Sequence, residues 1–179
     1  MASSSFVISS LVLLSLFSFP LSSLSMKTAK VDEICSRHRN PSFCAATLNS
    51  MTGGAIEVDL GSIGQNVILL AHTNAFDALT LIHSLISNTT DAQLKQHYVT
   101  CSGNYNDALF DLNQAKTALV SGDYNGVNTS AAAVKKDVEI CDSNPPADPS
   151  PLHMKNKNLE NLSIIVIIVS NFLAQNLLV

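Results

Sequence analysis

The chain has 179 residues, with 10 Lys or Arg against 14 Asp or Glu, so its formal net charge is −4. This length suits one domain of ordinary size, and the lack of a basic surplus argues against nucleic acid as a partner. With 7 Gly and 6 Pro, the composition also excludes collagen-like and low-complexity chains. Apolar residues make up 46% of the chain and charged residues only 13%, and much of the apolar excess lies at the two ends.

The N-terminal end, residues 1–25, contains no charged side chain and holds an apolar run that ends before Pro20. Such a run, followed by small residues such as Ser23 and Ser25, predicts a secretory signal peptide. An uncleaved membrane anchor is the alternative, but Pro20 and the serines interrupt a full span. Cleavage would leave residues 26–179 as a mature, secreted domain.

A helical hairpin is expected at about residues 29–51, with two short helices around Arg39-Asn40-Pro41, because proline is tolerated in a first helical turn. Cys35 and Cys44 flank this turn, which can fold the chain back on itself. Thiols pair in the oxidising compartment that a signal peptide implies, and four cysteines permit three connectivities. The positions of these two favour their pairing. No Cys-x-x-Cys occurs, so neither a thiol nucleophile nor a metal site is expected.

A four-helix bundle is expected at about residues 57–179. Its first helix shows apolar residues at helical spacing from Leu60 to Leu85 and ends around residues 87–88. The second has an unbroken heptad seam of Leu94, Tyr98, Cys101, Tyr105, Ala108, Leu112, Ala115 and Leu119. Asp91 suits its N-cap and Gly122 its C-terminal stop.

The third bundle helix is predicted after the cap candidate Asp123, with a seam of Val127, Ala131, Val134, Val138 and Cys141. Because the break before it is short, the second and third helices should be antiparallel neighbours. Antiparallel packing places the start of one beside the end of the other. A bridge between Cys101 and Cys141 is therefore geometrically natural.

The last helix follows a proline-rich connector, residues 145–151, that cannot be helical. Its apolar residues step by 3 and 4, which is typical of a bundle seam: Leu159, Leu162, Val166, Val169 and Leu173. By hydropathy the same segment could span a membrane or be the removable tail of a lipid-anchor signal. Asn, Ser and Gln residues interrupt the run, so a buried helix is favoured and membrane association is not expected.

No catalytic or phosphate-binding motif is present, so neither enzymatic activity nor a cofactor is expected. His72 and His83 share a helix face but lie about 16 Å apart along it, too far to bind one metal ion. Asp107 and Asp111 form an i, i+4 carboxylate pair, which is either a functional pair or a solvated face.

Three glycosylation sequons occur. Asn88 and Asn128 lie near predicted helix ends and are candidates for modification, whereas Asn161 falls within the last helix.

Several short motifs in a fixed order resemble the plant inhibitor family of pectin methylesterase and invertase, over about residues 32–173. They are Cys35 and Cys44 around Arg39-Asn40-Pro41, Cys101-x-x-x-Tyr105-x-Asp107-Ala108, Ser121-Gly-Asp-Tyr124 and Cys141. The resemblance implies an all-α fold, an up-down-up-down four-helix bundle preceded by a disulfide-closed N-terminal hairpin. It also implies the bridges Cys35–Cys44 and Cys101–Cys141.

The resemblance favours a secreted pectin methylesterase inhibitor of the plant cell wall. Some invertase inhibitors of the family carry Pro-Lys-Phe after a Gly-Asp, where this chain has Tyr124-Asn-Gly. In the esterase branch, a polar surface on the second and third bundle helices covers the enzyme's substrate cleft in a one-to-one complex. Mapped here, that surface would include Asn104, Asp107, Asp111, Asp142 and Ser143.

Some residues depart from the family pattern, notably Gly103 and Ser143 where acids are common and the apolar Phe110 where a polar residue would suit the contact. Two alternatives therefore stay open: an inhibitor of acid invertase that uses other contacts, and a non-inhibitory cell-surface protein, for example one anchored to lipid through its C-terminal tail.

Overall fold

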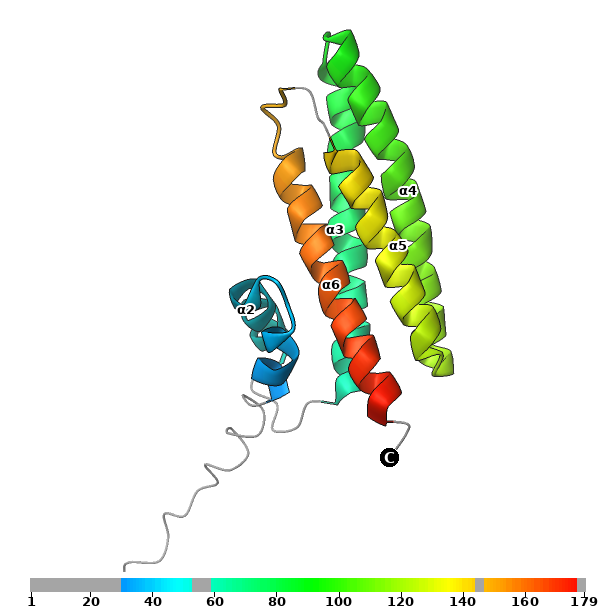
Figure 1. The fold of residues 1–179 in the computed structure, drawn as a ribbon. Helices are drawn as coiled ribbons and strands as arrows, with labels where there is room; N and C mark the ends of the chain where they lie inside the picture. Colours follow the sequence, from blue (N-terminus) through cyan, green and yellow to red (C-terminus); the bar gives the residue numbers. More distant parts are fainter. Residues whose placement is uncertain (1–29, 53–58, 144–146, 177–179) are drawn as a thin grey trace, which may run out of the picture.

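The computed structural model describes residues 30–52, 59–143 and 147–176, and within these segments it contains helices and no strand. Four long helices form an antiparallel bundle in which each helix packs against the next in chain order and the last returns to the first (Figure 1). They are α3 (Leu60–Asn88), α4 (Ala92–Ser121), α5 (Tyr124–Asp142) and α6 (Leu152–Asn176). The predicted four-helix bundle is confirmed, whereas the predicted signal peptide, residues 1–25, lies outside the described residues.

The helix ends are fixed by the residues that the sequence indicated. The carboxylate of Asp91 accepts a hydrogen bond from the backbone N–H of Leu94 at 2.8 Å, and Asp123 accepts one from Gly126 at 2.8 Å. Each such cap satisfies a backbone donor that has no partner within the helix and stabilises the helix by about 1 kcal/mol. Gly122 ends α4 in the left-handed conformation with φ 75°, a region that glycine enters without steric cost.

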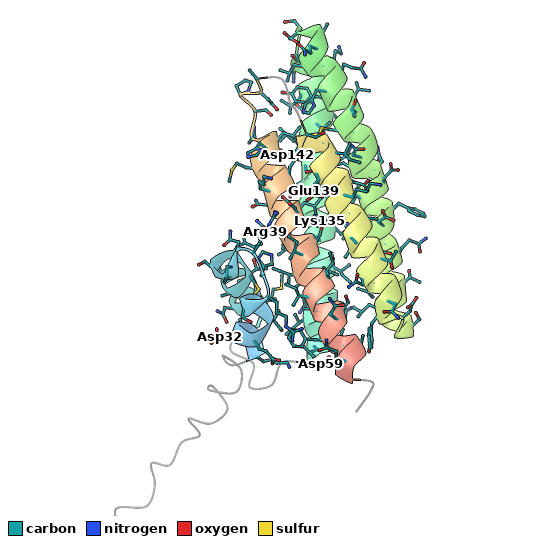
Figure 2. The ribbon with its side chains drawn as sticks, in the orientation of Figure 1. Asp32, Arg39, Asp59, Lys135, Glu139 and Asp142 are labelled. Atoms are coloured by element: carbon teal, nitrogen blue, oxygen red, sulfur yellow. A yellow bond between two sulfur atoms is a disulfide. The ribbon has the colours of Figure 1, made fainter. Side chains whose placement is uncertain are left out.

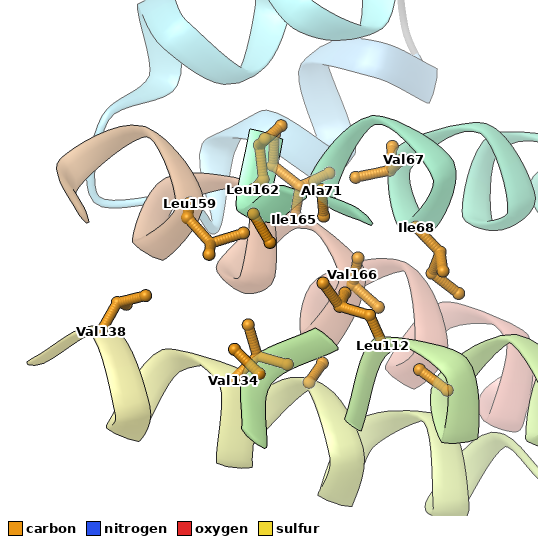
Figure 3. Packing of buried hydrophobic residues seen from close by; sticks show 14 of the residues in the cluster. Val67, Ile68, Ala71, Leu112, Val134, Val138, Leu159, Leu162, Ile165 and Val166 are labelled. Carbon is orange, nitrogen blue, oxygen red and sulfur yellow. The ribbon is translucent and has the colours of Figure 1, made fainter. Parts of the chain in front are cut away.

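The core lies along the axis of the bundle, where the predicted seams meet. Figure 3 shows side chains of α3, α4, α5 and α6 converging there, among them Leu112, Val134 and Val166. The seam residues of α4 from Tyr98 to Ala115 and all five of α5 are buried. The phenol of Tyr105 is also buried and donates to Asn156 Oδ1 of α6 at 2.7 Å, which joins two diagonal helices through the core.

Helix α6 is long and apolar enough to cross a membrane, but 61% of its most apolar stretch is buried inside the bundle. Leu159, Leu162, Val166 and Val169, four of its five predicted seam residues, are buried, and Leu173 packs against the core. The apolar side chains that make this segment resemble a membrane span are thus removed from water by packing against the other helices. The interpretation of this segment as a bundle helix is confirmed.

Both predicted disulfides are present. Cys35–Cys44 closes a hairpin between a short helix in residues 30–36 and α2 (Pro41–Thr52), with 5.5 Å between the Cα atoms. Cys101–Cys141 joins the start of α4 to the end of α5, with 4.8 Å between the Cα atoms. The first bridge holds the hairpin together, and the second ties the two helices that carry the candidate contact face.

The hairpin is fastened to α6 by polar contacts (Figure 2). The guanidinium of Arg39 pairs with Glu160 at 2.6 Å, and the glutamate side chain is only 4% exposed. Burial acts to raise the pKa of Glu160, but hydrogen bonds from Arg39 and Lys157 bring it below its usual value. His38 is buried, and its Nε2 lies 3.1 Å from the backbone oxygen of Asn161. These contacts link residues more than 100 positions apart.

Candidate functional site

A cluster of acids lies where α4 and α5 pack side by side. Asn104, Asp107 and Asp111 step by 3 and 4 along α4, so they share one face of the helix and span about 10 Å. Asp137 of α5 belongs to the same cluster, because the charges of Asp111 and Asp107 act on its carboxyl group. We call these four residues the acidic face. Asp137 was not among the residues predicted from the sequence.

Two carboxyl groups of the acidic face, those of Asp111 and Asp137, are partly withdrawn from water and lie near other acids. Burial, followed by the charges of Asp111 and Asp107, raises the pKa of Asp137 to about 6. Burial and the charge of Asp107 also raise the pKa of Asp111. Within the described segments, no cation forms an ion pair with Asp107, Asp111 or Asp137. The face is therefore electrostatically suited to a positively charged group from another molecule.

Two polar atoms of the acidic face are buried without a hydrogen-bond partner in the described structure. They are Nδ2 of Asn104, which is a donor, and Oδ2 of Asp137, which is an acceptor. A buried polar atom without a partner is costly, and most such atoms in proteins are satisfied by protein or ordered water. Because both atoms are enclosed in the described structure, their missing hydrogen bonds are a cost that the free protein bears at this face.

The other two predicted contact residues, Asp142 and Ser143, do not belong to the acidic face. Asp142, at the end of α5 (Figure 2), faces α6, where its carboxylate accepts from Asn156 Nδ2 at 3.1 Å and pairs with His153 and Lys157. Burial acts to raise the pKa of Asp142, but these hydrogen bonds lower it. Ser143 is the exposed C-cap of α5, and its hydroxyl donates to a carbonyl of the same helix. The structure therefore brings together three of the five predicted residues, without Asp142 and Ser143.

Apolar groups border the acidic face. Phe110 is 63% exposed and lies next to Asp107 and Asp111 on the helix surface, and Ile140 of α5 is 43% exposed. Exposed aromatic rings beside polar groups are frequent at the centres of protein interfaces. Gly103 is one helical turn away from Asp107, and a Cβ atom placed on it would meet nothing within 4 Å. This chain itself therefore gives no packing reason for a glycine there.

Two other features of the described residues offer weaker sites. His97 lies near Cys101 and Cys141, but both sulfurs are joined in the disulfide, so this group cannot supply thiolate ligands to a metal ion. A hollow lies between α3 and α4. It is lined by Gln65, Ile68, Leu69, His72, Leu112, Asn113 and Lys116.

The predicted glycosylation residues also differ in their surroundings. Asn88 is the exposed last residue of α3, whereas Asn128 is half-buried in α5 and its amide donates to Asn171 of α6.

The helical hairpin, the bundle and the two bridges define a class of disulfide-bonded helical proteins, and comparison with known proteins gives the family. Residues 29–174 match the family model described as "Plant invertase/pectin methylesterase inhibitor". The chain therefore belongs to this family, as the resemblance predicted. The matched relatives are named as inhibitors, and this protein is an inhibitor-family protein and not an enzyme.

Individual relatives agree with this assignment. The chain is 41% identical over 170 residues to a pectinesterase inhibitor of Actinidia deliciosa. This alignment covers 92% of this chain and 91% of the relative. It is 31% identical over 157 residues to pectinesterase inhibitor 2 of Arabidopsis thaliana, with 84% and 88% covered. Among solved structures, a mutant form of a pectin methylesterase inhibitor from Arabidopsis superposes with a TM-score of 0.72 at 26% identity. That superposition covers 79% of this chain and 95% of the other.

Proposed function

We propose that this protein is secreted to the plant cell wall and inhibits pectin methylesterase in a one-to-one complex, covering the substrate cleft of the enzyme with the outer surface of α4 and α5. Family membership and relatives named as pectinesterase inhibitors support the target. The acidic face is the observation that carries the contact site. Within the described residues, it combines carboxylates that form no ion pair with an exposed aromatic ring, on two helices that a disulfide holds together.

Inhibition in this proposal is steric and needs no chemical step from the inhibitor. A stable complex buries about 1,600 Å² in total, which two adjacent helices of this length can supply. A cationic side chain of the enzyme would pair with the acidic face and relieve the repulsion between its carboxylates. Charge pairs of this kind speed association when they lie at the rim and slow dissociation when they are buried.

Inhibition of acid invertase is the second candidate, and the turn between α4 and α5 argues against it. Here the turn is closed by Gly122 in the left-handed conformation and by the Asp123 cap on Gly126. The following residues, Tyr124-Asn125-Gly126, begin α5 at the place where invertase inhibitors with Pro-Lys-Phe have that motif. A non-inhibitory protein anchored through a removed C-terminal tail is the third candidate. Removal of α6 would expose the core that Leu159 and Ile165 help to fill.

The test is a titration of the oxidised protein, residues 26–179, against a plant pectin methylesterase, with acid invertase in parallel. We expect saturable loss of esterase activity at a one-to-one ratio and no effect on invertase. The double variant Asp107→Ala/Asp111→Ala should weaken inhibition with unchanged helicity. Asp77→Ala, which removes an exposed carboxylate on α3, is the matched control and should inhibit like the unmodified protein.

The outcomes separate the three candidates. Inhibition of invertase alone would identify invertase, and not the esterase, as the target. No inhibition of either enzyme, by a protein with the helical circular dichroism spectrum of a folded bundle, would favour the non-inhibitory protein. Full esterase inhibition by the double variant would retain the target and refute the acidic face as the contact site.

A further inference from the structure

Three Asn-x-Ser/Thr sequences begin at Asn88, Asn128 and Asn161, and they differ in exposure and in local secondary structure. N-glycosylation attaches a bulky polar oligosaccharide to the side-chain nitrogen, so the modified residue must lie at the surface with room around it. The recognition sequence also includes a hydroxyl two residues later. In an α-helix two residues are about 200° apart around the axis, so the helix turns the amide and that hydroxyl to nearly opposite sides.

Asn88 meets these conditions. It is exposed at the end of α3, and the next residue, Thr89, is extended with φ −83° and ψ 136°. Thr90, which carries the required hydroxyl, is outside the helix as well. The Asn88 amide donates two hydrogen bonds to Ser84, one to the carbonyl at 2.8 Å and one to the hydroxyl at 3.2 Å. A glycosylated amide keeps one hydrogen, so one of these bonds can persist.

Asn128 is held inside a helix–helix contact. Its Nδ2 donates to Asn171 Oδ1 at 2.9 Å and to Ser170 Oγ at 3.4 Å, both on α6. A sugar on this nitrogen would remove one of its two hydrogens and enter the boundary between α5 and α6. All three residues of this sequon, Asn128 to Ser130, are helical, so the Asn128 amide and the Ser130 hydroxyl point to different sides of α5. A glycan on Asn128 would therefore separate two packed helices.

Asn161 is even less accessible, since it is only 9% exposed on α6. The imidazole of His38 lies against its backbone oxygen, so the hairpin covers this turn of the helix. The hydroxyl of Ser163 is buried and donates to the carbonyl of Leu159. A chain modified at Asn161 before folding could not close its hairpin onto α6.

We propose that the secreted protein carries an N-linked oligosaccharide at Asn88 and at neither of the other two sequons; this rests on the secretion proposed above. In the modification, Asn88 Nδ2 attacks the anomeric carbon of a lipid-diphosphate-linked oligosaccharide. A C–N bond forms, the bond from that carbon to the diphosphate oxygen breaks, and the lipid diphosphate leaves. The amide proton passes to a base of the transferase, and no oxidant or reductant is needed.

The position of Asn88 is compatible with inhibition. It lies at one end of α3, and α3 packs against α4 and α6 but not against α5 (Figure 1). From Ala92 to Asp107, α4 rises about 22 Å. A glycan on Asn88 therefore extends from the end of the bundle and leaves the acidic face open.

The experiment expresses the full chain in a plant secretion host and recovers protein from the medium and from the cells. A peptide N-glycosidase that accepts plant glycans, used in heavy-oxygen water, converts each modified Asn into a labelled Asp that peptide mass spectrometry locates. We expect the label at Asn88 alone. Thr90→Ala should remove all glycan, and Ser130→Ala, the matched change in the second sequon, should leave the glycan in place.

Two results would overturn the inference. Secreted protein with Asn88 unmodified, or with label at Asn128 or Asn161, contradicts the selection of this site and leaves secretion intact. Protein that stays in the cells without any glycan contradicts both this inference and the proposed secretion. Inhibitory titrations before and after deglycosylation, with the same end point expected, check independently that the glycan avoids the acidic face.

Discussion

Asp137→Asn should make the protein more stable near neutral pH, although it replaces a residue of the candidate contact face. Folding raises the pKa of the Asp137 carboxyl from the ordinary 3.8 to about 6, first through burial and then through Asp111 and Asp107. The folded protein therefore keeps this proton up to about pH 6, whereas the unfolded chain releases it near pH 4. Between these values unfolding releases a proton, so stability falls as the pH rises through this window and stays lower above it.

The magnitude follows from the size of this pKa change. A tenfold change in proton affinity corresponds to about 1.4 kcal/mol, which sets an upper limit of about 3 kcal/mol for Asp137. Because the side chain is partly exposed, solvent screens the interaction, and we expect a gain of about 1 kcal/mol from Asp137→Asn at pH 7.5. The asparagine cannot ionise, so its advantage should become small near pH 3.5, where the carboxyl is mostly protonated in both states.

The assay is urea unfolding followed by circular dichroism at about pH 3.5, 5 and 7.5. With a slope of about 2 kcal/mol per molar urea, the gain corresponds to a midpoint shift of about 0.5 M at the highest pH. Asp77→Asn, an exposed carboxyl on α3, is the control and should show little shift at any of the three values. An unchanged or lower midpoint for Asp137→Asn at pH 7.5 would refute the reasoning, as would a gain that is equal at all three pH values.

Four further variants should differ in stability, each measurable by urea or thermal unfolding. Gly103→Ala should stabilise α4 by about 0.5–1 kcal/mol, because the new Cβ atom would meet no other atom within 4 Å. Gly122→Ala should destabilise the protein by about 1 kcal/mol, because the backbone there has a φ of 75°. Equal effects of the two changes on the free energy of unfolding would contradict this reasoning. Replacing Cys101 and Cys141 together by Ser should cost about 4 kcal/mol on the loop-entropy estimate, and no loss would refute a stabilising bridge. Arg39→Ala should cost about 1–3 kcal/mol because it leaves a buried glutamate on α6 with one partner fewer, and a loss below about 0.5 kcal/mol would show that the pair is dispensable.

The helices and bridges could be predicted because each depends on local, periodic information. A residue such as Leu112 is buried because of its place in the seam, and Asp91 caps α4 because the next helical residues follow it directly. The C-terminal segment was ambiguous for a physical reason. Apolar residues at helical spacing suit both a bilayer and a protein core, and only the other three helices show which one surrounds Val166.

The missed features depend on contacts between elements far apart in the chain. Asp137 precedes the seam residue Val138 and looks like any polar helix residue in the sequence. Its raised pKa arises because α4 brings two further carboxylates to it. Asp142 stays a predicted contact residue, but its ion pairs with His153 and Lys157 of α6 were not foreseen from the sequence. Helical periodicity tells which side of a helix is polar, but it does not tell which neighbour reaches that side.

The contrast between Asp142 and Asp137 links stability to the proposed function. Both side chains lie on α5 and both are partly buried, but one has three polar partners from α6 and the other leaves an oxygen without a hydrogen bond. Replacement of Asp137 by Asn would remove the cost of ionising a partly buried carboxyl. The carboxyl therefore lowers the stability of the free protein. A cationic group of a bound enzyme would recover it, because pairing favours the ionised form that the free protein disfavours.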